Sequence, residues 1–236
     1  MAKIRNAKPK ASSGGYTRVF DNEVLGTLIQ KVQSTVISNG TELEKLIIKN
    51  AVIIEDLDRF IEDVQEGKKA QGVYLCQKKT IKRSRYNLDK HEPDIIVFQL
   101  RPGAGLCYII ELKDGDAFDT KKSDGELESL RLYQNHLGAK IPFVTNYFIC
   151  AFNQTDKKVI VEGFKKRFSE EQVMTGEELC RILGIDYEAI VSRRKADAPD
   201  NVDFFVDELS KIPVVVAELH KKSLQHISDD DFYEEE

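Results

Sequence analysis

Hydrophobic positions gather into two clear short runs in the middle of this chain. Two short apolar runs, residues 95–100 and 106–112, flank the segment 101–105, which contains one proline and two glycines. Short apolar runs on either side of a Pro/Gly cluster are typical of two strands joined by a tight turn. The pattern therefore predicts a β-hairpin over residues 95–112.

Polar residues occupy the open end of this predicted hairpin. Side chains alternate between the two faces of a strand, so Glu111 and Lys113 point the same way. If the hairpin folds about Gly103, Asp94 lies opposite the segment that holds them. The sequence leaves the strand register open, and only some registers put Asp94 on the same face as the other two.

Two carboxylates and an ammonium at one place have a chemical use. Neighbouring carboxylates repel each other, and each is costly to bury without a partner. A divalent cation removes both problems, and Mg²⁺ prefers oxygen ligands such as carboxylates, phosphate and water. A lysine beside the metal would position or deprotonate an attacking water, or stabilise charge on the phosphate. These are the parts for metal-assisted hydrolysis of a phosphodiester.

The residues Pro93-Asp94, followed after sixteen positions by Glu111-x-Lys113, resemble the PD-(D/E)xK nuclease superfamily, best known from type II restriction endonucleases. The resemblance covers about residues 40–165. It implies Mg²⁺, with Mn²⁺ as a substitute, held by Asp94, Glu111 and the carbonyl of Leu112, while Lys113 acts on water. It also implies double-stranded DNA as the substrate and a homodimer. The alternative is a surface hairpin with a solvated Glu and Lys.

Helical periodicity precedes the hairpin. Apolar spacing predicts a helix from Asp21 to about residue 36, ended by Asn39-Gly40, and a second helix over residues 41–65. Thr41 and Glu44 have the spacing of a capping box at the start of the second helix. The resemblance would instead bring Glu44 close to the metal or its water shell, as a helper in catalysis. Both interpretations of Glu44 stay open.

The remaining pattern predicts alternating strands and helices. Thr175 is expected to cap a helix that Gly184 ends, and a second helix follows it. These two helices resemble a helix-turn-helix, with simple packing as the alternative. The expected strands cover 73–76, 141–152 and 158–163, and the expected helices cover 123–136, 176–183, 186–194 and most of 202–227, with a linker at 196–201. This order predicts an α/β fold in which a mixed central sheet is flanked by helices, forming a restriction-endonuclease-like core with additional C-terminal helices.

Basic residues gather on both sides of the proposed site. A net charge of −5 means that DNA affinity must come from local basic patches, because contacts to phosphate drive such binding. One patch lies just before Asp94 and a smaller one follows Lys113. The candidate DNA-binding residues are Lys78, Lys79, Lys82, Arg83, Arg85, Lys121 and Lys122. A solvated loop is the alternative for the first patch.

Composition bounds the rest. A hydrophobic content of 41% and a charged content of 32% describe a soluble globular protein. The four cysteines form no CxxC and lie in apolar contexts, so buried thiols in a reducing cytoplasm are expected. No apolar segment is long enough to span a membrane, and no signal-peptide core is present. The expected organisation is a basic arm (1–20), a catalytic core (21–165), a helical C-terminal region packed on it (166–228) and an acidic tail (229–236).

These patterns together predict a Mg²⁺-dependent type II restriction endonuclease that cuts double-stranded DNA at a short specific site. One rival is a repair or recombination nuclease of the same superfamily with low sequence specificity. Another is a DNA-binding module without catalytic activity, in which the two-helix unit and the basic residues contact DNA.

Overall fold

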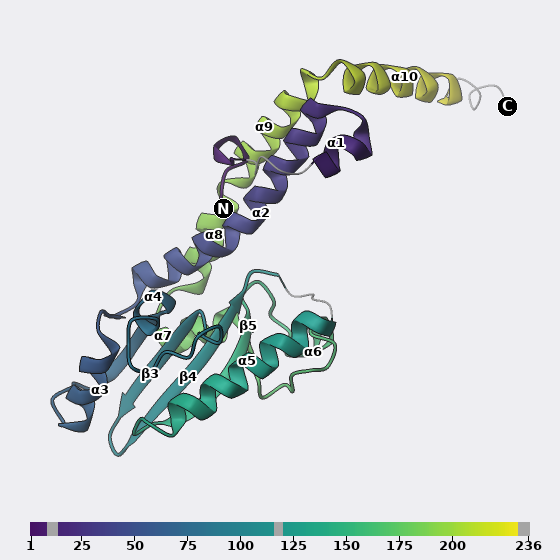
Figure 1. Cartoon of the computed structure of the whole chain (residues 1–236). Coiled ribbons are helices and arrows are strands. Elements are labelled where there is room, and N and C mark those ends of the chain that lie inside the picture. The colour runs from purple at the N-terminus through teal and green to yellow at the C-terminus, as the bar shows by residue number, and fades with distance from the viewer. Residues whose placement is uncertain (9–13, 116–119, 231–236) are drawn as a thin grey trace. The chain divides into compact units, whose positions relative to one another are not determined.

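The computed structural model describes residues 1–8, 14–115 and 120–230, and for residues 224–230 it describes the backbone alone (Figure 1). Internal contacts divide the chain into two units. The sheet unit comprises Leu43–Val191, and the helical unit comprises Met1–Glu42 with Ser192–Glu236.

A six-stranded mixed sheet forms the centre of the sheet unit. Its strands neighbour one another in the order in which they occur along the chain. The first two strands are parallel, the next two pairings are antiparallel, and the last three strands run parallel. The strands are β1 (Ile53–Ile54), β2 (Gly72–Gln77), β3 (Ile95–Arg101), β4 (Ala104–Lys113), β5 (Val144–Ala151) and β6 (Val173–Thr175). The predicted α/β fold with a mixed central sheet is thus confirmed.

Helices cover both faces of this sheet, and each face has its own apolar cluster. Buried residues of α3 (Leu57–Gln65), α5 (Thr120–Gly138) and α6 (Lys157–Gly163) belong to the first cluster. The end of α2 (Glu23–Asn50), α7 (Gly176–Leu183) and part of α8 (Tyr187–Lys195) supply the second. We call these sides the α5 face and the α7 face.

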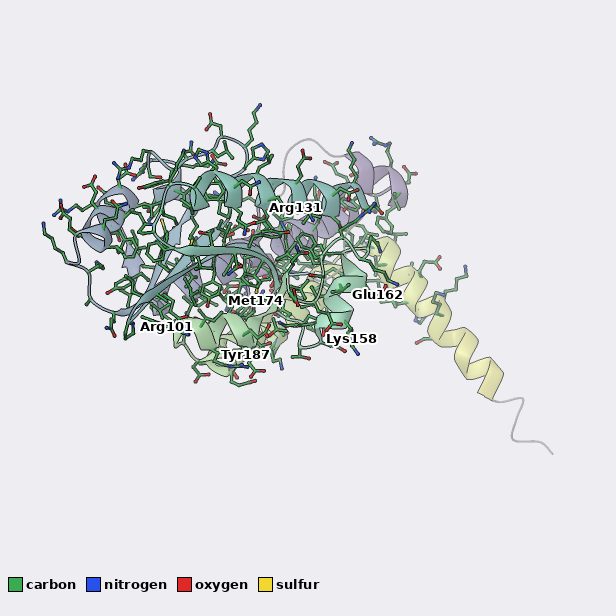
Figure 2. The ribbon with its side chains drawn as sticks, turned by 90° about the horizontal axis from the view of Figure 1, so that it is seen from below. Arg101, Arg131, Lys158, Glu162, Met174 and Tyr187 are labelled. Carbon is green, nitrogen blue, oxygen red and sulfur yellow. The ribbon has the colours of Figure 1, made fainter. Side chains whose placement is uncertain are left out.

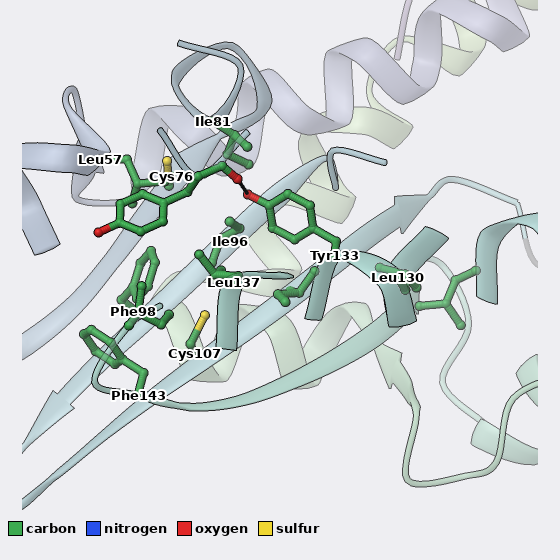
Figure 3. Close-up of a cluster of buried hydrophobic side chains, with 14 of the residues drawn as sticks. Leu57, Cys76, Ile81, Ile96, Phe98, Cys107, Leu130, Tyr133, Leu137 and Phe143 are labelled. Carbon is green, nitrogen blue, oxygen red and sulfur yellow. Dashed lines mark hydrogen bonds between the residues drawn. The ribbon is translucent and has the colours of Figure 1, made fainter. Parts of the chain in front are cut away.

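Aromatic side chains fill the α5 face (Figure 3). Phe98 of β3 lies against Phe143, with ring centroids 5.0 Å apart. Cys107 of β4 belongs to the same cluster and lies near these rings (Figure 3). Tyr133 of α5 is fully buried and donates its hydroxyl hydrogen to the carbonyl of Tyr86 at 3.0 Å. This hydrogen bond satisfies a polar group that would otherwise be costly to bury. All four cysteines are free and buried, as expected from their apolar contexts.

The predicted break at Asn39-Gly40 is wrong, because α2 runs without interruption from Glu23 to Asn50. A single glycine inside a helix costs only about 1 kcal/mol, and the buried Leu43 and Ile47 continue the apolar face beyond it. The helix start was also misplaced. Asn22, not Asp21, accepts the N–H of Leu25 at 2.9 Å.

The chain between α2 and β2 holds a separate short helix instead of the end of a long one. Asp56 caps α3, because its side chain accepts the N–H of Arg59 at 2.9 Å. The two-residue strand β1 precedes this cap and was not predicted, since so short a strand has no readable periodicity.

Residues 158–163 were predicted to form a strand, but they lie in helix α6 (Figure 2, where Lys158 and Glu162 are labelled on this helix). Asp156 caps α6 by accepting the N–H of Lys158 at 2.8 Å. Ile160 is buried while Val159 is exposed, so the run of apolar residues is not a buried strand. Short apolar runs are ambiguous between helix and strand, and the preceding Asp decides this case.

The helical unit is built from η1 (Ile4–Asn6), α1 (Gly14–Phe20), most of α2, α9 (Ala198–Ser210) and α10 (Pro213–Asp230). The predicted linker at 196–201 is wrong from Ala198 onward, where α9 begins. The short N-terminal segment is held in place: Ile4 donates its N–H to the side chain of Asn201 at 2.8 Å, and Arg5 pairs with Asp200. Among the described residues, no helix combines the length and the apolar character needed to cross a bilayer.

Candidate active site

The β3–β4 hairpin carries the predicted site residues and fixes the register that the sequence left open. Gly103 turns the chain with a φ of +73°, a conformation that favours glycine. From this turn the strands pair up to Ile95 opposite Ile110. The next position along the register places Asp94, directly before β3, opposite Glu111.

All three motif residues share one face of the sheet. Glu111 and Lys113 alternate with Leu112 along β4, and Ile109, two residues earlier, belongs to the α5 face. Leu112 itself belongs to the α7 face. Asp94 directly precedes β3 and lies two and four positions before Ile96 and Phe98, which belong to the α5 face, so its side chain points to that face. The structure therefore brings the two carboxylates and the ammonium together at the open end of the hairpin.

Asp94 is held by two different elements. Its Oδ2 accepts the backbone N–H of Leu112 at 3.0 Å, and its Oδ1 accepts a hydrogen bond from Lys78 Nζ at 3.1 Å. Lys78 follows β2 directly, and its own N–H donates to the Asp94 carbonyl at 3.1 Å. Lys78 was predicted to contact DNA, and the structure places it beside the first carboxylate.

Lys113 lies between two carboxylates. Its Nζ donates to Glu111 Oε1 at 2.7 Å and to Glu126 Oε1 at 2.6 Å. The side chains of Lys113 and Glu111 are each 14% exposed, and that of Glu126 is 20% exposed. Glu126 belongs to α5 and was not predicted as a site residue. Its position between the buried Ser123 and Leu130, at helical spacing, was the signal that could have found it.

Burial and charge perturb the pKa values of this cluster. Burial raises the pKa of Glu111 above its ordinary value, the neighbouring Asp94 raises it further, and Lys113 opposes both. Burial acts to lower the pKa of Lys113, but Glu111 and Glu126 outweigh it and raise the pKa overall. Lys113 therefore remains an ammonium at neutral pH. Carboxylates that resist ionisation are typical of a site that awaits a cation.

Glu44 lies in the interior of α2, so it is not a helix cap. Its pKa is raised by burial and by the charge of Asp94, while Lys78 and Lys113 lower it. An electrostatic interaction with these three residues means that Glu44 is close to the cluster. The half-buried carboxylate thus enters the site from a helix on the α7 face.

The other predicted DNA-binding residues are all exposed. Lys79, Lys82 and Arg83 are exposed around α4 (Lys78–Ile81), and Lys121 and Lys122 are exposed at the start of α5. Arg85 is exposed as well, but its guanidinium pairs with Glu62 at 3.3 Å and lies over the Tyr86 ring.

The two-helix unit packs against the sheet. Gly184 ends α7 in the left-handed conformation, and the helix begins with the capping box predicted at Thr175. Leu179, Cys180 and Ile190 are buried in the cluster of the α7 face. This burial supports packing over DNA reading for these helices.

The donor atoms at the hairpin end fit a hard cation. No three Asp, Glu, His or Cys side chains of the described chain gather closely enough to hold a metal by themselves. Mg²⁺, however, is commonly bound by one or two carboxylates together with water and phosphate. Leu112 directs its N–H toward Asp94, and the N–H and C=O of one strand residue point to the same side of the strand, so its carbonyl also points toward β3.

Comparison with known proteins identifies the family. No family model matches the chain, and no solved structure matches it. Over 226 residues the chain is 51% identical to the type II restriction enzyme HhaII of Haemophilus parahaemolyticus, an alignment that covers 94% of this chain and 99% of the relative. The chain belongs to the type II restriction enzymes. This restriction enzyme is therefore an endonuclease, and the hydrolase activity predicted from the hairpin residues is confirmed at that level.

Proposed function

We propose that this restriction enzyme hydrolyses phosphodiester bonds of double-stranded DNA at a short specific site, through a PD-(D/E)xK site that binds Mg²⁺. One observation carries the proposal. The hairpin register sets Asp94 opposite Glu111, with Lys113 on the same face. That is the arrangement which the motif requires and which a solvated surface hairpin has no reason to adopt.

The carboxylates of Asp94 and Glu111 and the carbonyl of Leu112 would hold the metal. Bound there, Mg²⁺ supplies a Lewis acid that offsets charge on the scissile phosphate and makes water more acidic, and Mn²⁺ has the same preference for oxygen ligands. Asp94 is already oriented by Leu112 and Lys78, so little reorganisation is needed when the site is filled.

Lys113 acts as a fixed positive charge. Its carboxylate partners Glu111 and Glu126 raise its pKa although burial opposes this, so they favour the protonated form. The ammonium orients the attacking water and stabilises the negative charge that develops on the phosphate. Glu44 is proposed as a helper that accepts hydrogen bonds from water near Asp94, because its half-buried carboxylate already interacts with that residue.

Binding of the substrate falls to the exposed basic residues. Lys79, Lys82 and Arg83 on one side and Lys121 and Lys122 on the other are proposed to contact the DNA backbone, because exposed cations next to the site can pair with phosphates. The described chain holds one hairpin site, and a duplex has two strands. A homodimer is therefore proposed, with one site for each strand.

The test compares Glu111→Gln and Lys113→Met with Glu128→Gln, an exposed position on α5. With plasmid DNA and Mg²⁺, the first two variants should lose cleavage by a factor on the order of 10²–10³. Glu128→Gln should cleave like the unmodified enzyme, and all three variants should still bind DNA. Wild-type cleavage by either site variant would refute the assignment.

Sequence specificity is tested by the products. Discrete fragments with uniform ends from mixed plasmid and genomic DNA would support the restriction activity. Smeared products would favour a nuclease of low specificity, and binding without cleavage in millimolar Mg²⁺ would favour a module without catalytic activity.

A further inference from the structure

Among the described residues, Lys113 has a carboxylate partner that the hairpin motif does not provide. Glu111, two residues earlier on the same strand, is one of the carboxylates at its Nζ. The other carboxylate is that of Glu126, from the helix that follows β4, at 2.6 Å. The ammonium is thus held between a strand and a helix.

The two carboxylates have different duties under the proposed function. Glu111 is proposed to bind Mg²⁺ as well as Lys113. A metal there would weaken the attraction between Glu111 and Lys113, and it would add a second positive charge near the ammonium. Glu126 accepts from Lys113 on the side of α5 and is not opposite Asp94 in the sheet. It therefore remains a partner for the ammonium when Glu111 is occupied.

The position of Glu126 is rigid enough for this purpose. It lies on the inner side of α5, between the fully buried Ser123 and the nearly buried Leu130. Helix α5 connects the parallel strands β4 and β5, and it contacts both of them. A flexible lysine tied to such a helix loses the freedom to swing away from the reacting phosphate.

We propose that Glu126 is a positioning residue for the reaction: it anchors the Lys113 ammonium beside Glu111 while Glu111 serves the metal. The proposal rests on the proposed function of the hairpin site. It predicts that loss of the Glu126 charge slows the chemical step without weakening the binding of DNA.

The experiment uses Glu126→Gln, which keeps the size of the side chain and removes its charge, with Glu128→Gln as the matched control on the same helix. We expect kcat to fall by about 10–100-fold in Glu126→Gln, the range typical of residues that orient active-site groups. KM and metal-free DNA binding should stay within about twofold of the unmodified enzyme. Glu126→Asp, which keeps the charge, should recover part of the lost kcat.

A second readout does not depend on activity. In protein labelled with ¹⁵N at the lysine amines, the Lys113 ammonium should give a signal protected from solvent exchange, identified by its loss in Lys113→Met. Protection should vanish in Glu126→Gln and persist in Glu128→Gln. This measurement stays informative even if thermal unfolding shows that Glu126→Gln is less stable.

The outcomes separate this inference from the proposed function. If Lys113→Met is inactive but Glu126→Gln has normal kcat and a protected ammonium, the role of Glu126 is refuted and the hairpin site stands. If Lys113→Met cleaves normally, the proposed function itself fails. A fall in DNA binding that matches the fall in kcat would also overturn the positioning role.

Discussion

The sheet unit and the helical unit differ in their least exposed ion pairs and in how many large apolar side chains they expose. In the sheet unit, charged groups meet where they are nearly buried: Glu111 and Lys113 are each 14% exposed. In the helical unit, the Arg5–Asp200 pair lies at the surface, with Arg5 43% exposed. Large apolar side chains, in contrast, are exposed along the helical unit, at positions such as Ile37, Val206 and Leu219.

This difference supports the proposal that the nearly buried charges, and not the exposed ones, serve catalysis. Exposed ion pairs contribute little to stability, typically about 0–1 kcal/mol. Nearly buried charges are costly to desolvate, so they are weak evidence for stability, and they are often found at functional sites. The exposed apolar positions of the helical unit have a different meaning. Apolar surface rimmed by polar residues favours contact with another molecule.

Removal of the metal should produce the largest effect and should be confined to the sheet unit. We expect EDTA to abolish plasmid cleavage and excess Mg²⁺ to restore it, because the proposed function assigns the activation of water to a metal held by Asp94, Glu111 and Leu112. Circular dichroism should show unchanged helix content throughout. Cleavage that persists in EDTA would break the link between the buried charges and a cation.

Lys78→Ala sharpens the contrast between charges inside and outside the site. Lys78 orients Asp94 at 3.1 Å, so its loss should lower cleavage by about 10–100-fold. Lys79→Ala, one residue away and exposed, should chiefly reduce affinity for DNA and its dependence on salt. Steady-state kinetics at several salt concentrations separate the two. If Lys78→Ala and Lys79→Ala both lowered only the affinity for DNA, and by the same factor, Lys78 would be a contact to the DNA backbone and not a residue that orients Asp94.

Gly176→Ala tests how tightly the sheet unit is packed. A Cβ at this position would clash with the backbone carbonyl oxygen of Phe152, so the backbone must move to admit it. We expect the free energy of unfolding to fall by about 1–3 kcal/mol, measured by chemical denaturation. An unchanged midpoint would mean that the start of α7 is not fixed against β5.

Gly40→Ala should give the smallest effect, and of opposite sign. Gly40 lies inside α2 with nothing within 4 Å of an added Cβ, so alanine should stabilise the helix by about 0.5–1 kcal/mol. The thermal midpoint should rise by about 1–4 °C. A fall would instead indicate a helix break at Asn39-Gly40.

The sequence was most informative where one local pattern dominated. The hairpin could be predicted because its apolar runs and its Pro/Gly turn are adjacent, and the spacing of Asp94 and Glu111 follows from it. Lys78 was predicted as a DNA contact beside the site, but its pairing with Asp94 was not foreseen, because strand pairing creates it; Glu126 was missed, because the crossover helix α5 brings it to Lys113. The helical errors have local causes: Gly40 is tolerated within α2, and Asp156 turns an apolar run into α6.

The order in which the site can be assembled follows from its connections. The hairpin joins Asp94 to Glu111 through a short closed loop, so the entropic cost of that contact is low and it can form early in folding. Pairing of β4 with β5 spans a much longer stretch of chain and requires α5, which connects them, to pack on the α5 face of the sheet. A partly synthesised chain that ends before α5 would thus carry both carboxylates while Lys113 lacks its second anchor, and full nuclease competence would arise late, after the crossover has closed.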